Sequence, residues 1–209
     1  MSEDKDLILM GYSGHSYVVI DIAKSMGLIP IAYFEFKEAL KNPYNIKYLG
    51  KENEYTEGNA LQNKFVFPAV GDNLIRSKLT KLIKRNNWKE TVIADSTSNI
   101  SSTTSIGYST LIGTNAIINS CTKIGEGVII NTGATIEHAC IISDYVHVAP
   151  GAILAGGVKV GAMTFIGAGA IIINGVTIGS NSVIGAGAVV INDIPNNQTW
   201  VGNPAKRIK

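Results

Sequence analysis

The chain has few of the cysteines and histidines that build disulfide frameworks and metal sites, and it lacks the large net charge of proteins that bind highly charged partners. It has two cysteines, Cys121 and Cys140, and three histidines among 209 residues. Two cysteines are too few for a disulfide framework, so both are expected to be free thiols. The formal net charge is only +2, which gives no reason to expect nucleic acid or an acidic membrane as a partner.

Long apolar runs are also absent. None approaches the ~18–20 residues that a membrane-spanning helix needs. The first residues, MSEDKDLILMGYSG, lack the basic region and cleavage site of a secretory signal. Hydrophobic content of 45% with 16% charged residues is typical of a folded globular chain. We therefore expect a cytoplasmic protein without membrane insertion.

Composition divides the chain into two parts. Residues 1–90 hold 24 of the charged side chains and 6 of the 22 glycines, whereas residues 91–209 hold 10 charges and 16 glycines. We place a domain boundary at this shift and predict an N-terminal domain (1–92), a second domain (93–193) and a C-terminal tail (194–209).

The second part has a strict period of six. From Ile100 to Val190, sixteen consecutive positions six residues apart all carry an aliphatic residue. Glycine directly follows this position at Gly107, Gly113, Gly125, Gly161, Gly167, Gly179 and Gly185, and small residues such as Ala116, Ala134, Cys140 and Ala152 lie two places before it. A period of six suits neither an amphipathic helix nor a hairpin sheet, and an accidental period in a β-sandwich is very improbable over sixteen steps. The pattern predicts a parallel β-solenoid whose glycines permit corner turns and whose coils must stack to bury their apolar faces.

The N-terminal part predicts a small β-α-β-α-β unit with a parallel sheet. Apolar runs at 7–10, 29–34 and 65–70 predict strands, helical spacing follows the first and third of them, and ETVIAD (90–95) reads as the last strand before the solenoid. The first turn, GYSGHS, could place a helix N-terminus against a phosphate, although a plain strand-to-helix turn fits about equally well. The polar stretch 42–63 is expected to cover part of a ligand pocket.

Two sets of motifs carry a resemblance to a known family. VTIGSNSVIGAG and the tail VGNPAKRI resemble hexapeptide-repeat acyltransferases, which implies a left-handed parallel β-helix with three hexapeptides in each 18-residue coil. With GYSGHSYVVIDIA and AVGDNLIR added, nearly the whole chain is similar to the sugar acetyltransferases typified by NeuD and PglD. That resemblance implies homotrimers, with acetyl-CoA lying between neighbouring β-helices.

The same resemblance implies specific roles for named residues. In its nucleotide-sugar members, the N-terminal domain holds the nucleotide, which implicates Ser13, Gly14, His15, Glu35 and Gly71 as substrate-binding residues. His138 is implied as general base and His147 as a contact to acetyl-CoA, while the pantetheine arm would pass small residues at Ala168 and Ala186. We expect no bound metal.

The two histidines of the segment TIEHACIISDYVHV fit this assignment. His138 and His147 both fall on outward positions of the repeat, half a coil apart, so within one chain they leave opposite sides. They could meet across a cleft between solenoids of a threefold ring. Imidazole is a suitable base for a proton lost from an attacking amine or hydroxyl. Gly156 lies one coil after His138, so its amide could stabilise the oxyanion formed from the thioester.

One position departs from the family pattern. Several nucleotide-sugar members have a glutamate directly after the catalytic histidine, and here that residue is Ala139. Glu137 precedes the histidine, but adjacent residues on a strand point to opposite faces. Asp144 of a neighbouring chain, a backbone carbonyl or water could orient His138 instead.

These observations leave three hypotheses. The first is an acetyl-CoA-dependent N-acetyltransferase acting on a nucleotide-linked 4-amino-4,6-dideoxy sugar of a surface glycan, with UDP the favoured nucleotide. The second is an O-acetyltransferase of sialic acid or another glycan sugar. The third is a non-catalytic scaffold or a zinc enzyme of the carbonic-anhydrase type. The zinc site would need three converging histidines, and His15 lies in the other domain.

Overall fold

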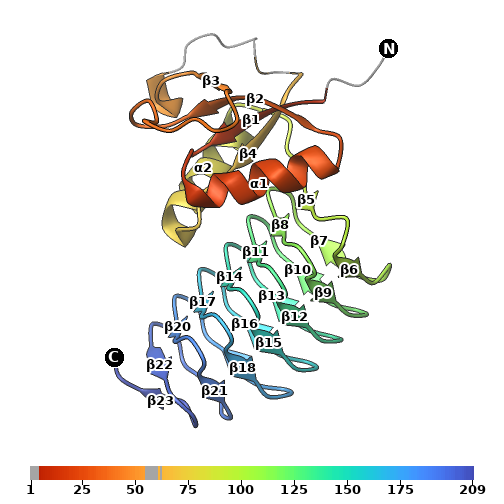
Figure 1. Ribbon diagram of the computed structural model, residues 1–209. Coiled ribbons are helices and arrows are strands. Elements are labelled where there is room, and N and C mark those ends of the chain that lie inside the picture. Colours follow the sequence, from red (N-terminus) through yellow and green to blue (C-terminus); the bar gives the residue numbers. More distant parts are fainter. Residues whose placement is uncertain (1–4, 55–60, 62) are drawn as a thin grey trace.

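The protein consists of a small α/β domain followed by a left-handed parallel β-helix (Figure 1). The computed structural model describes residues 5–54, 61 and 63–209. Within this part, no helix combines the length and apolar character needed to cross a bilayer.

The N-terminal domain is built on a four-stranded parallel sheet. Its strand order is β3-β2-β1-β4, from β1 (Asp6–Met10), β2 (Ile29–Phe34), β3 (Lys47–Tyr48) and β4 (Phe65–Pro68). The helices are α1 (Gly14–Ser25) and α2 (Asn73–Arg85), and Glu52–Glu54 form a 3-10 turn. The three apolar runs were predicted as strands, and the structure confirms them. Strand β3 was not predicted, because its two residues are too few to show an alternation of apolar and polar side chains.

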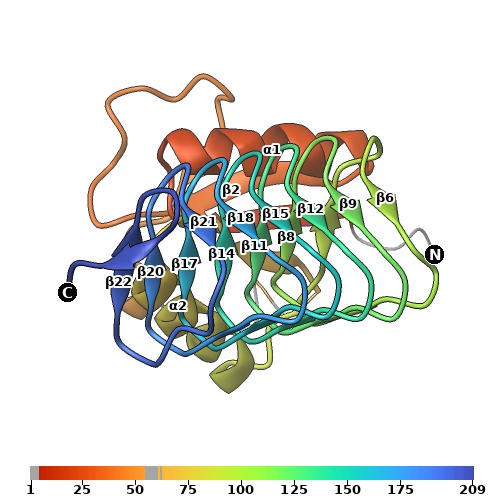
Figure 2. The same cartoon turned by 90° about the horizontal axis from the view of Figure 1, so that it is seen from below.

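The two helices cover opposite faces of this sheet. Helix α1 lies between the sheet and the solenoid, where Val19, Ile20 and Ala23 share a core with Ile93, Leu111 and Ile129 of the solenoid. Helix α2 packs on the other face through Leu79 and Ile83. Figure 2 shows α1 lying along the row of coils. One apolar core thus joins the two domains.

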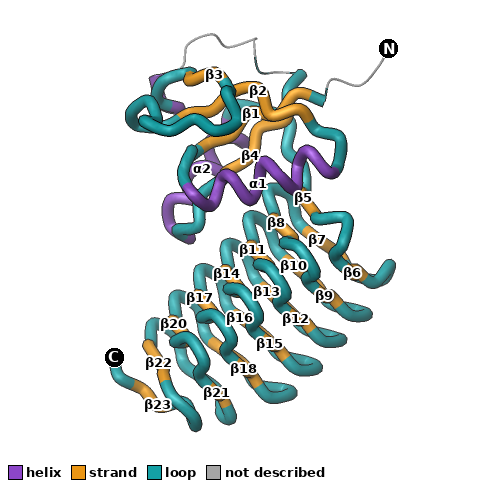
Figure 3. The backbone as a smooth tube through the Cα atoms, viewed as in Figure 1, coloured by secondary structure: helices purple, strands orange, loops and turns teal. Residues whose placement is uncertain are grey.

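The solenoid consists of two-residue strands separated by turns (Figure 3). Strands three apart in sequence pair in parallel with a register of 18 residues, as in Ile124↔Ile142 and Ile129↔His147. They are β5 (Ile93–Ala94), β6 (Asn99–Ile100), β7 (Ser105–Ile106), β8 (Leu111–Ile112), β9 (Ile117–Ile118), β10 (Lys123–Ile124), β11 (Ile129–Ile130), β12 (Thr135–Ile136), β13 (Ile141–Ile142), β14 (His147–Val148), β15 (Ile153–Leu154), β16 (Lys159–Val160), β17 (Phe165–Ile166), β18 (Ile171–Ile172), β19 (Thr177–Ile178), β20 (Val183–Ile184) and β21 (Val189–Val190).

These strands form three sheets, which we name by what they present outward. The docking sheet holds β5, β8, β11, β14, β17 and β20 and faces the N-terminal domain in its first coils. The apolar sheet holds β6, β9, β12, β15, β18 and β21. The polar sheet holds β7, β10, β13, β16 and β19, whose outward residues include Lys123, Lys159 and Thr177.

The core confirms the predicted inward positions. From Ile112 to Val190, every aliphatic residue of the six-residue period is buried, and the small residues before them are buried with them. Each buried Ile, Leu or Val side chain contributes about 1.5–3 kcal/mol relative to an exposed one. Cys140 lies in this core and Cys121 is exposed, and both are free thiols, as expected.

The glycines after the inward residue have a different role from the predicted one. The left-handed turn position lies two residues later and is filled by glycine or by other residues, among them Asn115, Ala139 and Met163. Gly107 and Gly161 do not have positive φ. A Cβ on either of them would lie 2.5–2.6 Å from the backbone N of the next coil. These glycines are therefore needed for the close stacking of successive coils, not for the turn itself.

The strand in ETVIAD also differs from the prediction. Ile93–Ala94 pairs with β8 and opens the docking sheet of the solenoid, so it is not part of the N-terminal sheet. Its residues continue the six-residue period backward, since Ala94 lies six before Ile100. At the other end, β22 (Thr199–Val201) pairs with β20, and β23 (Lys206–Arg207) adds an antiparallel strand.

Candidate functional site

His138 lies at the corner between the apolar and polar sheets, in the turn from β12 to β13. It is exposed, which leaves its imidazole accessible. The next coil stacks directly on it, since the N–H of Gly157 donates to the carbonyl of His138 at 2.9 Å. The predicted column of His138 and Gly156 is therefore present in the structure.

Gly156 is in close contact with the His138 ring. A Cβ on Gly156 would lie 2.6 Å from both Cε1 and Nε2 of the imidazole. The absence of a side chain thus leaves room for the histidine itself, a reason that the sequence did not reveal. Among the described residues, the N–H of Gly156 donates to no acceptor, so it is available to a ligand.

The surroundings of His138 provide no carboxylate partner within the described part of this protomer. The Glu137 carboxylate accepts from Asn119 Nδ2 at 2.9 Å, along the same corner. Ala139 has a left-handed φ of 59°. Asp144 accepts from the backbone N of Glu126 at 2.9 Å. A carboxylate that orients His138 would therefore have to come from another protomer.

His147 lies in a different environment from the one predicted. Its side chain points outward from β14, but the N-terminal domain covers that side of the solenoid and leaves only 9% of the residue exposed. Within one protomer it contacts the N-terminal domain and does not meet His138. The prediction treated the solenoid alone, and it missed this cover because the docking of one domain on another leaves no periodic signal.

Both ring nitrogens of His147 have protein partners. Nδ1 lies 3.2 Å from the carbonyl oxygen of Gly71, and Nε2 lies 3.2 Å from Asn131 Nδ2. The Phe165 ring packs edge-on against the imidazole with centroids 5.1 Å apart. Asn131 and the residues around Gly71 therefore belong to the site, although sequence reasoning singled out only Gly71.

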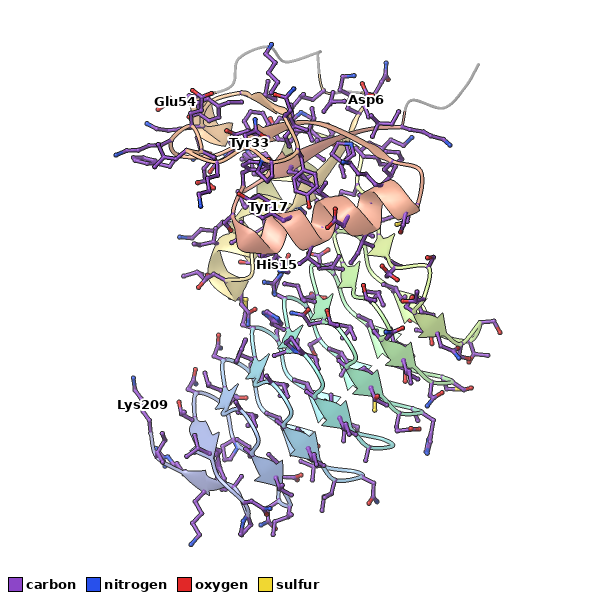
Figure 4. All side chains as sticks on the ribbon, in the orientation of Figure 1. Asp6, His15, Tyr17, Tyr33, Glu54 and Lys209 are labelled. Carbon is purple, nitrogen blue, oxygen red and sulfur yellow. The ribbon has the colours of Figure 1, made fainter. Side chains whose placement is uncertain are left out.

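His15 completes a histidine pair at the junction of the two domains. It lies in the first turn of α1 and faces the solenoid (Figure 4). Its ring centroid is 6.3 Å from that of His147. Burial, and then the positive charge of Arg76, lower the pKa of each histidine to about 4. Both rings are therefore neutral at pH 7, and neither is well placed to act as a base there.

The remaining predicted nucleotide residues separate into two clefts. Ser13 and Glu35 lie in a cleft of about 220 Å³ at the carboxyl edge of the parallel sheet, which we call the loop cleft. It is lined by Gly11, Ser13, Phe34, Glu35, Glu52, Val70, Ile75 and Leu79. Glu52 comes from the polar stretch 42–63, of which residues 55–60 and 62 lie outside the described residues.

Glu35 connects the first turn to the end of β2. Its carboxylate accepts from the backbone N of Tyr12 at 3.0 Å and from that of Phe36 at 2.9 Å. Gly14 begins α1, and the turn is closed by Ser16, whose hydroxyl accepts from Ser13 N at 2.9 Å. Carboxyl edges of parallel sheets are the usual place for nucleotides in α/β folds.

Gly71 lies in the second cleft, of about 420 Å³, which we call the junction cleft. The beginning of α2 forms one side and strands β17 and β20 form the other. It is lined by Gly71, Asp72, Asn73, Leu74, Met163, Phe165, Asn181 and Val183. Asn73 holds the two sides together, since its Nδ2 donates to the carbonyl of Met163 at 3.0 Å.

Ala168 and Ala186 lie on the other corner of the apolar sheet, between it and the docking sheet. Both are exposed and stack one coil apart, with the N–H of Gly187 donating to the Ala168 carbonyl at 2.9 Å. The apolar sheet therefore separates these residues from His138 within one protomer. Among the described residues, no three His, Cys, Asp or Glu side chains converge as metal ligands.

Comparison with protein families identifies both domains. The model of the PglD N-terminal domain matches residues 6–83. Two hexapeptide models match the solenoid: the hexapeptide repeat of succinyl-transferase at 103–138 and the bacterial transferase hexapeptide at 157–192. No curated protein sequence matches the chain.

Solved structures match over almost the whole chain. Perosamine N-acetyltransferase from Caulobacter crescentus, in complex with CoA and GDP-perosamine, is 30% identical with a TM-score of 0.90, covering 98% of this chain and 97% of that one. The acetyltransferase domain of PglB from Neisseria gonorrhoeae, in complex with acetyl coenzyme A, is 29% identical with a TM-score of 0.90, covering 98% and 100%. WeeI from Acinetobacter baumannii shares the fold at 24% identity and a TM-score of 0.86, covering 97% and 99%.

Proposed function

The chain belongs to the acetyl-CoA-dependent hexapeptide-repeat sugar acetyltransferases of the NeuD/PglD type, and from this premise we propose that it N-acetylates a nucleotide-linked 4-amino-4,6-dideoxy sugar of a surface glycan. The observation that carries the proposal is the pairing of an accessible His138 with the Gly156 amide in one column. A base beside an unengaged N–H donor is what attack on a thioester requires.

The proposed reaction is a direct transfer. The sugar amine attacks the thioester carbonyl carbon, and His138 accepts the proton that the nitrogen loses. The carbonyl oxygen gains charge and receives the N–H of Gly156. The new C–N bond then remains, the C–S bond breaks, and the thiolate leaves and takes up a proton as CoA-SH.

The nucleotide assignment rests on the loop cleft. Ser13 and Glu35 line it, and the backbone N–H groups at the start of α1 favour a phosphate nearby. Gly14 begins α1 directly after Ser13, and His15 and Gly71 lie at the domain junction; all three stay proposed substrate contacts. GDP is as good a candidate for the nucleotide of the substrate as the predicted UDP, because a 30% identical relative was solved with GDP-perosamine.

A homotrimer would assemble the site from two chains. Within one protomer the apolar sheet separates His138 from Ala168 and Ala186, and strand β13 of the polar sheet separates it from His147. That sheet exposes Ile117, Ile153 and Ile171, each about 40% exposed and stacked on one face. Burial of such a stripe against a neighbouring solenoid would stabilise a closed ring and bring the two corners together. The acetyl-CoA arm would then pass Ala168 and Ala186 and reach His147. A cytoplasmic location, where acetyl-CoA and nucleotide sugars are available, fits this proposal.

The proposed function is tested by CoA-SH release from acetyl-CoA with a panel of acceptors. The panel contains UDP-, dTDP- and GDP-linked 4-amino-4,6-dideoxy sugars, with free and CMP-linked sialic acid. We expect rapid release with one nucleotide amino sugar and an N-acetylated product by mass spectrometry. His138→Gln should abolish turnover while acetyl-CoA binding and oligomeric state are kept, which a scaffold would not show. Release with sialic acid alone would replace the proposal with the O-acetyltransferase alternative.

A further inference from the structure

Arg76 is a buried cation at the junction of the two domains. It lies in the first turns of α2 and is 1% exposed. Among the described residues, its hydrogen-bond acceptors are all neutral oxygens: the carbonyls of Val70, Gly71, Gly127, Tyr145 and Val146, and the side-chain amide of Asn73. A buried charge is costly unless its donors are satisfied, and the rigid fork of a guanidinium suits a ring of carbonyls.

This fork joins the N-terminal domain to two coils of the solenoid. Nε donates to Gly127 at 2.6 Å, and Nη2 donates to Tyr145 at 3.0 Å, two residues before His147. Nη1 donates to Gly71 at 2.8 Å. The Gly71 carbonyl also lies 3.2 Å from Nδ1 of His147, so one oxygen contacts both the guanidinium and the imidazole.

The contacts of His147 define which nitrogen carries its proton. A backbone carbonyl only accepts, so Nδ1 must be the protonated nitrogen. On the other side, Asn131 Oδ1 accepts from the backbone N of Thr132 at 2.8 Å, which turns Nδ2 of Asn131 toward Nε2 of His147. Nε2 is therefore the acceptor of the neutral ring.

We propose that Arg76 is a positioning residue that holds the Gly71 carbonyl and thereby locks His147 as its Nδ1–H tautomer. A ligand that displaces the Asn131 amide then finds an acceptor at Nε2, which selects an N–H or O–H donor such as an amide of the pantetheine arm. A carbonyl group of the ligand is not recognised at that nitrogen. The ligand part of this inference rests on the proposed function; the tautomer does not.

The electrostatic surroundings keep the ring in this neutral form. Burial lowers the pKa of His147 most, Arg76 on α2 and His15 on α1 lower it further, and the hydrogen bond with the Gly71 carbonyl opposes them by raising it. The other ionisable groups at the guanidinium are Asp72, which caps α2, and Tyr145 of the solenoid. With a pKa of about 4, His147 carries no second proton at neutral pH.

The tautomer can be read directly, because the chain has only three histidines. Full-length protein labelled with ¹⁵N in histidine rings is measured without ligand at pH 7, with His15→Gln, His138→Gln and His147→Gln assigning the signals. Long-range ¹H–¹⁵N spectra distinguish the two neutral tautomers from imidazolium. We expect the Nδ1–H form for His147 in the wild type. An Nε2–H or protonated ring would overturn the proposal before any variant of Arg76 is made.

Arg76→Lys then tests the positioning role while keeping the charge. A lysine ammonium cannot satisfy the ring of carbonyls, so we expect His147 to become a mixture of tautomers. The KM for acetyl-CoA should rise roughly tenfold, the equivalent of one lost hydrogen bond, with a smaller change in kcat. Lys84→Gln is the matched control, since Lys84 also ties α2 to the solenoid by pairing with Glu126. It should leave the His147 ring unchanged.

Two results would contradict this role for Arg76. One is a folded Arg76→Lys protein whose His147 keeps the pure Nδ1–H form. The other is a Lys84→Gln protein that disturbs His147 as much as Arg76→Lys does, because general loosening of the domain contact would then explain both. If no acceptor of the panel were acetylated, these two results would keep their meaning, since the spectra are recorded without substrates.

Discussion

At the scale of single residues, the site depends on the absence of a side chain at Gly156. Gly156 places an unengaged amide against the His138 ring, with no room for even a methyl group between them. Gly156→Ala should therefore displace the imidazole and lower kcat/KM by about 100-fold, in the range found for loss of an oxyanion contact. Asn174→Ala, one coil further along the same column, is the control and should keep activity. Equal activity of both variants would separate Gly156 from the chemistry.

The buried histidine pair makes a second prediction at this scale. His15 and His147 titrate at about 4 in the folded protein and near 6.5 when unfolded, so between these values the unfolded chain binds more protons. The contribution of these two neutral histidines to the free energy of unfolding should be complete above pH 6.5. It should be lost progressively as the pH drops toward 4. At pH 5 the loss is up to about 2 kcal/mol for each histidine.

Denaturant unfolding at pH 7 and pH 5 measures this effect. His147→Gln should reduce the difference between the two pH values, because glutamine does not titrate. His138→Gln serves as the comparison on the exposed corner. An unchanged pH dependence in His147→Gln would show that this ring is not held neutral by the domain junction.

At the scale of elements, the six-residue period predicted the solenoid because each strand contributes one large inward side chain, and the structure has these residues buried. The period could not predict why glycine follows them. Gly107 is required by the backbone of the next coil, a contact 18 residues away in sequence. Likewise β5 was placed in the wrong sheet, because a two-residue strand at a boundary fits either neighbour.

The stacking glycines give a prediction at this scale. Gly107→Ala would place a Cβ 2.6 Å from the backbone N of Glu126, so the coils must separate. We expect a loss of about 2–3 kcal/mol in the free energy of unfolding. Gly175→Asn is the control: its φ of 75° is left-handed, but no atom of the described residues lies within 4 Å of a Cβ there. It should cost less than about 1 kcal/mol, since asparagine tolerates that conformation. Similar losses in both variants would contradict the stacking role.

At the scale of the whole molecule, the sequence could not show how the domains meet. His138 and its column follow from the repeat alone, and both are found where the repeat places them. The cover over His147, its contact with His15 and the buried Arg76 depend on docking α1 and α2 against the solenoid. The motif AVGDNLIR contains both Gly71 and Arg76, but only the tertiary structure shows that Arg76 holds the Gly71 carbonyl.

The central claim is that one active site takes His138 from one chain and His147 from another. The most direct test mixes His138→Gln and His147→Gln proteins, each first shown to be nearly inactive alone, by unfolding and refolding them together in equal amounts. If the site lies between chains, random assembly should restore about a quarter of wild-type activity. At each site of a threefold ring, half of the first chains keep His138 and half of the neighbouring chains keep His147. If both histidines serve the site from the same chain, no mixed trimer contains an intact site, and activity that stays at the level of the single variants would contradict the account.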